Sequence, residues 1–146
     1  SYYQKEITAM HIAVRTSLPD NPLFIDGNAE QLGKTIMSLL NNGMYAIAKK
    51  YGKKAYPAEI GLALESKDGQ AVIRLYDNGV GIEQSILDKI FDPFFTTKTT
   101  GEAAGIGLYL SKEIILNHHG QIAVRSEKDE LTEFTITLPL WEEKSV

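Results

Sequence analysis

Several stretches of the chain alternate apolar with polar or small residues in the manner of β-strands. Two of them, Glu59–Ser66 and Gln70–Tyr76, flank the segment Lys67-Asp68-Gly69. Asp-Gly is a preferred pair for a tight hairpin turn, so these stretches predict a β-hairpin. The remaining strands are expected at Ala9–Arg15 and Leu23–Ile25, and as an antiparallel pair at Gln121–Ser126 and Glu133–Leu138.

A long helix is expected after Asn28, because apolar residues then recur three and four positions apart as far as Ile47. This spacing predicts about five turns that end near Lys50. Asn28 is the expected N-cap, and Gln31, three residues later, fits the second position of a capping box.

Two shorter helices are predicted at Gln84–Ile90 and Ile106–Asn117, the second capped by Gly120. Between them, Asp92–Ala104 has no apolar period and predicts a loop that orders on binding. The side chains expected to face inward from the last helix are Leu110, Ile114 and Ile115. Together the elements predict an α+β two-layer sandwich, with a mixed, mostly antiparallel sheet of about six strands and about three helices on one face.

Composition narrows the class of protein. The 146 residues are 43% hydrophobic and 23% charged, as expected of one folded domain spanning residues 1–146. The absence of cysteine excludes disulfides and thiol catalysis, and the net charge of −4 disfavours unspecific nucleic-acid binding. No apolar run approaches the roughly 20 residues that span a bilayer, so we expect no direct membrane contact. The absence of cysteine is compatible with the reducing cytoplasm, where we expect the domain to lie. Because the chain begins with Ser, we expect it to be one domain of a longer protein. A membrane anchor elsewhere in that longer protein is compatible with this expectation.

The segment Asp77–Ile82 has glycines at Gly79 and Gly81 directly after a predicted strand. Alternating glycines let a flat ligand approach the backbone closely, and an aspartate beside them can accept a hydrogen bond from an amine such as that of adenine. Asp-Asn-Gly is equally a sequence of ordinary turns.

Gly105-Ile106-Gly107-Leu108 opens the last predicted helix. Free N–H groups and the positive end of the helix dipole favour phosphate at such a position. The alternative is that the glycines ease tight packing where the loop enters the helix. Neither a dinucleotide-binding βαβ unit nor a P-loop surrounds this motif.

Polar side chains also gather on one face of the long helix, at Ser38, Asn42, Tyr45 and Lys49. This face is either one wall of a ligand site or a solvated surface. Similarly, the aromatic residues of Phe91–Lys98 either form a docking surface or anchor a loop to the core. None of the three histidines has metal-ligand spacing, so no metal cage is assigned.

In chain order these motifs resemble the four conserved boxes, N, G1, F and G2, of the histidine-kinase ATP-binding domain. That family belongs to the gyrase-like, chaperone, kinase and mismatch-repair ATPases, which share the Bergerat fold. The matching segments are Asn42, Asp77–Ile82, Phe91–Lys98 and Gly105–Ile115, flanked by Ser38–Gly43 and the strand-like Phe134–Pro139.

The resemblance implies that the domain binds ATP and Mg²⁺. It assigns the adenine amino group to Asp77, Mg²⁺ to Asn42 and a hydroxyl near adenine to Thr132. It also implies that Phe94 and Phe95 connect a mobile lid with partner helices. The residues assigned to the nucleotide are Asn42, Tyr45, Ala46, Lys49, Asp77, Gly79, Gly81, Ile82, Lys98, Gly105, Ile106, Gly107, Leu108 and Thr132.

The sequence departs from the family pattern at several positions. Gly43 stands where the family has alanine, and Tyr45 and Ala46 stand where many members have lysine and tyrosine. A basic phosphate contact is then left to Lys49 or Lys98, between which the sequence does not decide. Ala103-Ala104 stands where the family usually has Gly-Thr, so the sequence does not decide the geometry of the lid's hinge.

Three functions fit the resemblance: transfer of the γ-phosphoryl group to histidine, ATP hydrolysis, and binding without chemistry. Ser38 replaces an asparagine of the family pattern, whereas relatives that hydrolyse ATP resemble one another in having glutamate there as a base. A neutral imidazole needs no such base, so Ser38 favours histidine phosphorylation. The implied partners are the dimerisation and phosphoacceptor helices of the same kinase, which carry the histidine, and a response regulator.

Overall fold

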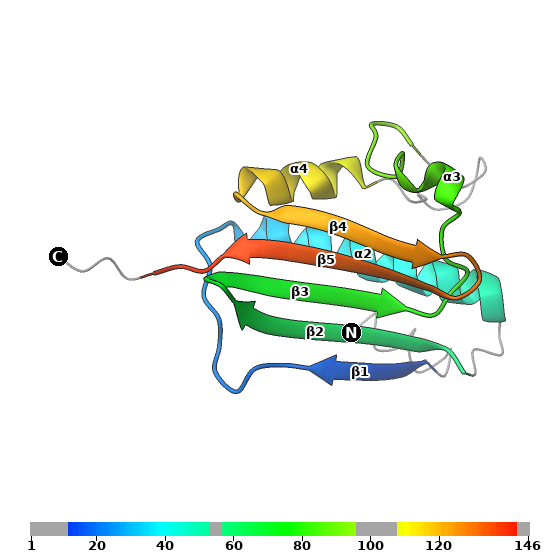
Figure 1. Cartoon of the computed structure of the whole chain (residues 1–146), viewed down its shortest axis with the longest axis horizontal. Helices are drawn as coiled ribbons and strands as arrows, with labels where there is room; N and C mark the ends of the chain where they lie inside the picture. The colour runs from blue at the N-terminus through cyan, green and yellow to red at the C-terminus, as the bar shows by residue number, and fades with distance from the viewer. Residues whose placement is uncertain (1–11, 53–56, 96–107, 143–146) are drawn as a thin grey trace.

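In the described part of the chain, a five-stranded sheet carries helices against one face (Figure 1). The computed structural model describes residues 12–52, 57–95 and 108–142. The strands are β1 (Ala13–Ser17), β2 (Glu59–Lys67), β3 (Gln70–Asp77), β4 (Gln121–Glu127) and β5 (Leu131–Pro139), in the spatial order β1-β2-β3-β5-β4. Only β1–β2 among these pairs is parallel, which confirms the predicted α+β fold with a mixed, mostly antiparallel sheet.

The predicted hairpin is confirmed as β2–β3, where Lys67 pairs with Gln70 across a two-residue turn. Both turn residues have left-handed backbone conformations, with φ of 52° at Asp68 and 76° at Gly69. Two positive φ values in succession define the type I′ turn, whose twist matches that of the strands. The hairpin therefore follows from local sequence.

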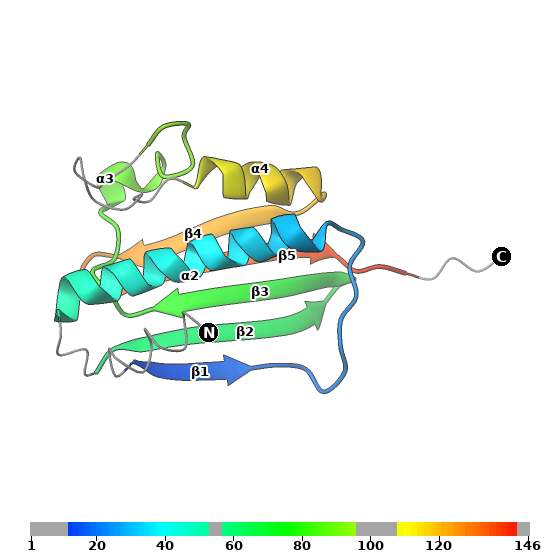
Figure 2. The same cartoon turned by 180° about the vertical axis from the view of Figure 1, so that it is seen from behind.

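The longest helix, α2 (Ala29–Tyr51), runs across one face of the sheet (Figure 2). On that face β5 directs its alternate residues inward, from Thr132 to Leu138, all buried. The opposite face carries ion pairs between neighbouring strands, among them Arg15–Glu59 and Arg74–Glu65, both at 2.8 Å. This division of the sheet places the core, and the site described below, on the side of α2.

Asn28 is the N-cap of α2 and accepts a hydrogen bond from the Gln31 N–H at 3.0 Å, as predicted. The capping box itself is not completed by Gln31, because the Asn28 N–H donates to His118 Nε2 at 2.9 Å. His118 Nδ1 lies 2.7 Å from the Ile114 carbonyl oxygen. One imidazole thus joins the start of α2 to the end of α4 (Tyr109–Asn117).

Four local predictions were wrong, concerning Leu23–Ile25, Leu110, the helix over Gln84–Ile90 and the cap at Gly120. Leu23–Ile25 is not a strand, although the Trp141 N–H donates to the Phe24 carbonyl at 2.7 Å. Leu110 is 71% exposed. At 100° per residue it lies about 140° around α4 from Ile115, which is buried, so the two cannot both face the sheet.

The predicted helix over Gln84–Ile90 is shorter in the structure, where α3 covers Gln84–Leu87. The chain then continues in tight turns, in which the Lys89 N–H donates to the Ile86 carbonyl and the Asp92 N–H to the Lys89 carbonyl. This i to i+3 pattern tightens the backbone and ends the α-helix.

Gly120 has a different role from the predicted C-cap. The left-handed position after α4 is taken by His119, with φ of 62°. Gly120 lies instead against β5, where a methyl group would collide with the Thr137 carbonyl oxygen and lie 2.7 Å from Leu138 Cδ2. The glycine is needed because α4 and the sheet approach closely here.

We expect Gly120→Ala to lower the free energy of unfolding by about 1–3 kcal/mol, the range typical of overpacking. Gly33→Ala is the matched control, since Gly33 lies in α2 with open space around it. It should raise stability by roughly 0.5–1 kcal/mol through helix propensity. Urea denaturation measures both, and equal effects of the two alanines would contradict the close approach.

Candidate functional site

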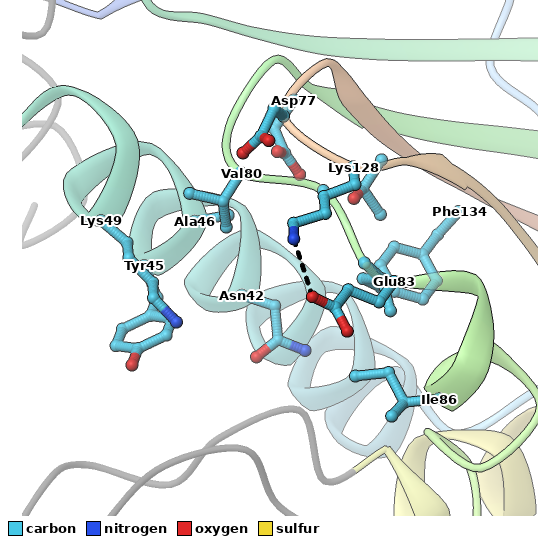
Figure 3. A pocket seen from close by; sticks show the side chains of 14 residues that line it. Asn42, Tyr45, Ala46, Lys49, Asp77, Val80, Glu83, Ile86, Lys128 and Phe134 are labelled. Atoms are coloured by element: carbon cyan, nitrogen blue, oxygen red, sulfur yellow. Dashed lines mark ion pairs between the residues drawn. The ribbon is translucent and has the colours of Figure 1, made fainter.

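A cavity of about 280 Å³ opens between α2, the segment after β3 and the turn that joins β4 to β5 (Figure 3). It collects most of the predicted ligand residues from distant parts of the chain. The lining residues are Asn42, Tyr45, Ala46, Lys49, Asp77, Val80, Gly81, Ile82, Glu83, Ile86, Lys128, Asp129, Thr132 and Phe134.

Asp77 is the last residue of the central strand β3 and is only 5% exposed. Its Oδ1 accepts a hydrogen bond of 2.9 Å from the Gly79 N–H. Burial raises the pKa of Asp77 to about 7, although this hydrogen bond and the charge of Lys50 act to lower it. A buried carboxyl group whose pKa is raised in this way is typical of a functional position.

The segment after Asp77 fits its surroundings because it contains two glycines. A methyl group at Gly79 would lie 2.6 Å from the backbone and the Cβ of Ala46 in α2. Gly81 has φ of 69°, and a methyl group there would collide with the Glu127 carbonyl. These approaches fix the segment between α2 and β4, so Gly79 serves the site by packing rather than by lining it.

Thr132 lies opposite Asp77, since the two residues pair across β3 and β5. Its side chain is buried, with Oγ1 2.8 Å from Ser126 Oγ. Ser126 also accepts the Ile82 N–H at 2.8 Å. The buried hydroxyls thereby hold the predicted residues Thr132 and Ile82 at the wall of the cavity.

The α2 wall presents Asn42, Tyr45, Ala46 and Lys49 from neighbouring turns of the helix (Figure 3). Within the part of the chain that the structure describes, Asn42 Nδ2 is buried and has no hydrogen-bond partner. A buried amide without a partner loses the free energy of its missing hydrogen bond. Asn42 is therefore a side chain suited to a ligand.

The structure adds residues that sequence reasoning missed. Glu83 and Lys128 form an ion pair of 2.9 Å at the cavity, and the hydrogen bond and charge of each partner move the pKa of Glu83 down and that of Lys128 up. Lys128 and Asp129 come from the β4–β5 turn, whose position depends on long-range strand pairing. Their charged neighbours in sequence gave no signal of a ligand site.

A second missed group supports the segment after β3 from outside the cavity. Lys50 donates to the carbonyl oxygens of Asn78 and Asp129, at 3.2 and 2.6 Å. Asn78 in turn bonds β2 through its side chain, accepting the Glu59 N–H at 2.8 Å. These contacts explain the asparagine of the Asp-Asn-Gly motif as a structural residue.

Three predicted residues lie elsewhere among the described ranges. Leu108 is buried in the core, and its N–H donates to the Ile90 carbonyl at 3.3 Å, so that amide is already engaged. Phe94 is fully exposed with φ of 66°, while Phe95 packs partly buried against the core. The predicted residues Lys98, Gly105, Ile106 and Gly107 lie outside the described residues.

We expect Asp77→Asn to stabilise the ligand-free protein at pH 8 and to have little effect at pH 4. The folded state keeps the Asp77 proton up to about pH 7, whereas the unfolded chain releases it near 4, so unfolding becomes easier as pH rises between these values. One pKa unit corresponds to about 1.4 kcal/mol, so the gain at pH 8 is up to about 4 kcal/mol.

Urea denaturation of both proteins at the two pH values measures this difference. The amide keeps an oxygen for the Gly79 N–H, so the test isolates the charge. The prediction is that the substitution raises the free energy of unfolding at pH 8 and hardly changes it at pH 4. A substitution that lowers the free energy of unfolding at pH 8 would contradict a buried charge at Asp77.

Comparison with known proteins places this site in a family. A family model described as histidine kinase-, DNA gyrase B-, and HSP90-like ATPase matches residues 27–142. Sporulation kinase D of Bacillus subtilis (strain 168) is 34% identical over 123 residues, which are 84% of this chain and 22% of that protein. The signal transduction histidine-protein kinase AtoS of Escherichia coli (strain K12) is 39% identical over 122 residues, which are 83% of this chain and 19% of that protein.

Solved structures agree in fold. The nucleotide-free catalytic domain of the histidine kinase ThkA has a TM-score of 0.78 at 23% identity, covering 94% of this chain and 85% of that one. ThkA in complex with the response regulator TrrA has a TM-score of 0.72 at 22% identity, covering 94% and 37%. The chain spans about a fifth of the length of the two curated relatives. From the matched residues, which include the whole described cavity, the chain belongs to the histidine kinase-, DNA gyrase B- and HSP90-like ATPase family.

Proposed function

We propose that this chain is the catalytic and ATP-binding domain of a sensor histidine kinase. It binds Mg²⁺–ATP and transfers the γ-phosphoryl group to a histidine on a separate dimerisation and phosphoacceptor domain, within two-component signalling. The observation that carries the proposal is the buried Asp77 in the cavity, which the family's ATP-binding role explains. The whole span 1–146 is proposed to act as this one domain.

Base recognition is the role of Asp77. Its carboxylate accepts a hydrogen bond from the exocyclic amine of adenine, while Ile82, Ile86 and Phe134 supply apolar walls for the flat ring. A hydrogen bond to a charged group is worth about 1.5–3 kcal/mol, which offsets part of the cost of burying the charge. The Asp77 carboxylate of the ligand-free protein is therefore an acceptor to which bound adenine donates a hydrogen bond.

Asn42 is the proposed magnesium ligand. Mg²⁺ prefers oxygen ligands, and a half-turn of the amide presents Oδ1 where the unpartnered Nδ2 lies. When bound, the ion supplies charge neutralisation for the phosphates. Lys49 at the same wall offers a positive charge to the phosphates, and Lys98 is the other candidate for that contact.

Ser38 separates this function from ATP hydrolysis. It lies in α2 one turn before Asn42, outside the residues that line the cavity, and bears no carboxylate that could activate water. The incoming nucleophile must then be able to attack without a base at this position. A neutral histidine meets that requirement.

The proposed partners are the phosphoacceptor helices of the same kinase and a response regulator. Phe94, fully exposed in a left-handed conformation, is the described residue best placed for contact with another surface. None of the described helices is both long and apolar enough to cross a bilayer. A cytoplasmic position of the domain is part of the proposal.

We expect Asn42→Ala to separate nucleotide affinity from its dependence on Mg²⁺. The adenine contacts remain, whereas the proposed oxygen ligand is removed. Calorimetric titration with ATP, in Mg²⁺ and in chelator, should show that the ion strengthens binding to the unsubstituted protein but not to the variant. Equal stimulation by Mg²⁺ in both proteins would remove Asn42 from the metal site.

We expect the purified chain to bind ATP without phosphorylating itself, and to phosphorylate the helical hairpin of its parent kinase added in trans. Phosphoryl transfer requires an acceptor aligned with the γ-phosphate. His118 does not qualify, because both its ring nitrogens lie within hydrogen-bonding distance of backbone atoms.

Radiolabelled γ-phosphate measures the transfer. Acid-labile label on the hairpin alone supports the proposal, while label on this chain alone would contradict it. Rapid release of inorganic phosphate without any acceptor would instead indicate the hydrolytic alternative.

A further inference from the structure

Ser126 in β4 is only 3% exposed and is not among the described residues that line the cavity. Three polar groups lie within hydrogen-bonding distance of its Oγ. They are the Ile82 N–H at 2.8 Å, the Leu131 carbonyl oxygen at 2.7 Å and Thr132 Oγ1 at 2.8 Å. A hydroxyl oxygen has one proton to donate and two lone pairs that accept, so these three contacts use its whole capacity.

The direction of each hydrogen bond follows from the partner of Ser126. The Ile82 N–H can only donate, and the Leu131 carbonyl oxygen can only accept. The single Ser126 proton therefore lies on the Leu131 side, and Thr132 must be the donor in its contact with Ser126. If Ser126 donated to Thr132 instead, two oxygens would face each other at 2.7 Å with no proton between them.

This assignment determines what Thr132 presents to a ligand. Its one hydroxyl proton is directed at Ser126, so toward the cavity the Thr132 oxygen can only accept hydrogen bonds. Thr132 and Asp77 both line the cavity, and they pair with each other across β5 and β3. An ionised carboxylate is likewise an acceptor without a proton. Two neighbouring acceptors thus face the ligand.

We propose that Ser126 is a specificity-determining positioning residue. By accepting the Thr132 proton, it fixes the Thr132 hydroxyl as an acceptor toward the cavity and so selects a base that bears an exocyclic amine over one that bears a carbonyl group. An amine has two N–H protons, one for each acceptor. A carbonyl oxygen has only lone pairs and leaves both acceptors without a partner, which is a strong basis for rejecting a ligand.

The test compares ATP with inosine triphosphate, which carries a carbonyl group where adenine has its amine, by calorimetric titration. This inference rests on the proposed role of Asp77 in base recognition. The unsubstituted protein should prefer ATP by at least about tenfold, the value of one charge-assisted hydrogen bond. In Ser126→Ala the Thr132 hydroxyl is able to turn and donate to the carbonyl group. The preference should then fall by about threefold to tenfold, the value of one neutral hydrogen bond.

Ser111→Ala is the matched control. Ser111 is a buried serine of α4 and is not among the described residues that line the cavity. Its substitution removes a buried hydroxyl group of the same kind, and it should leave the preference for ATP unchanged.

Thr132→Val distinguishes the proposed path from the other contacts of Ser126. Ser126→Ala also removes the partner of the Ile82 N–H, and Ile82 lines the cavity. The substitution is therefore made in the unsubstituted protein and in the Thr132→Val protein. If Ser126 acts through the Thr132 hydroxyl, Ser126→Ala lowers the preference in the first protein and leaves it unchanged in the second. Equal reductions in both proteins would place the effect on Ile82 or on packing and would overturn the inference.

A measurement on the unsubstituted, nucleotide-free protein does not depend on whether any variant folds. The Thr132 hydroxyl proton and the Ile82 amide proton both point at Ser126 Oγ, which places the two protons about 3 Å apart. Nuclear magnetic resonance should show a slowly exchanging Thr132 hydroxyl proton with a nuclear Overhauser contact to the Ile82 amide. A hydroxyl proton that lacks this contact, or that exchanges with water too quickly to be observed, would overturn the proposed orientation.

The titrations keep the two claims apart. If the unsubstituted protein binds both nucleotides equally, base recognition by Asp77 is wrong, and the proposed function with it. If it prefers ATP and Ser126→Ala keeps the same preference as Ser111→Ala, only the role of Ser126 is overturned.

Discussion

The burial of one carboxyl group at the end of a central strand is the constraint on which this structure depends. Asp77 is 5% exposed, between strands that pair with it on both sides. Its hydrogen bond from Gly79 and the nearby charge of Lys50 offset only part of the desolvation. The free protein therefore holds a destabilised acceptor, and a ligand with an amine group recovers some of that free energy on binding.

Close approach of backbones makes such burial possible. Gly79 lets the segment after β3 lie against Ala46, and Gly81 lets it pass beneath the turn between β4 and β5. Lys50 then joins this segment to the same turn through two carbonyl oxygens. The cavity is thus assembled from three distant parts of the chain that these contacts hold together.

The sequence predicted the elements whose causes are local. The β2–β3 hairpin follows from Asp68-Gly69, and α2 follows from its apolar spacing and its cap at Asn28. Prediction failed where distant contacts decide. His118, rather than Gln31, completes the cap of α2, and Leu110 turns outward because Ser111 and Ile115 are the buried residues of α4.

The candidate site divides in the same way. The resemblance to the histidine-kinase motifs gave Asp77, Asn42 and Thr132, which the structure brings to one cavity. Glu83 and Lys128 were missed because their meeting depends on how the β4–β5 turn folds over the site. A charged residue in a turn has no feature in sequence that distinguishes it from an ordinary surface residue.

The most direct test of this account is the ionisation of Asp77 itself, followed by the ¹³C chemical shift of its carboxyl group as pH is varied. The account predicts a midpoint of about 7 in the ligand-free protein, and a carboxyl group that stays ionised to lower pH when adenosine is bound. A midpoint near 4, unchanged by adenosine, would show that the carboxylate is neither strained by burial nor engaged by the base.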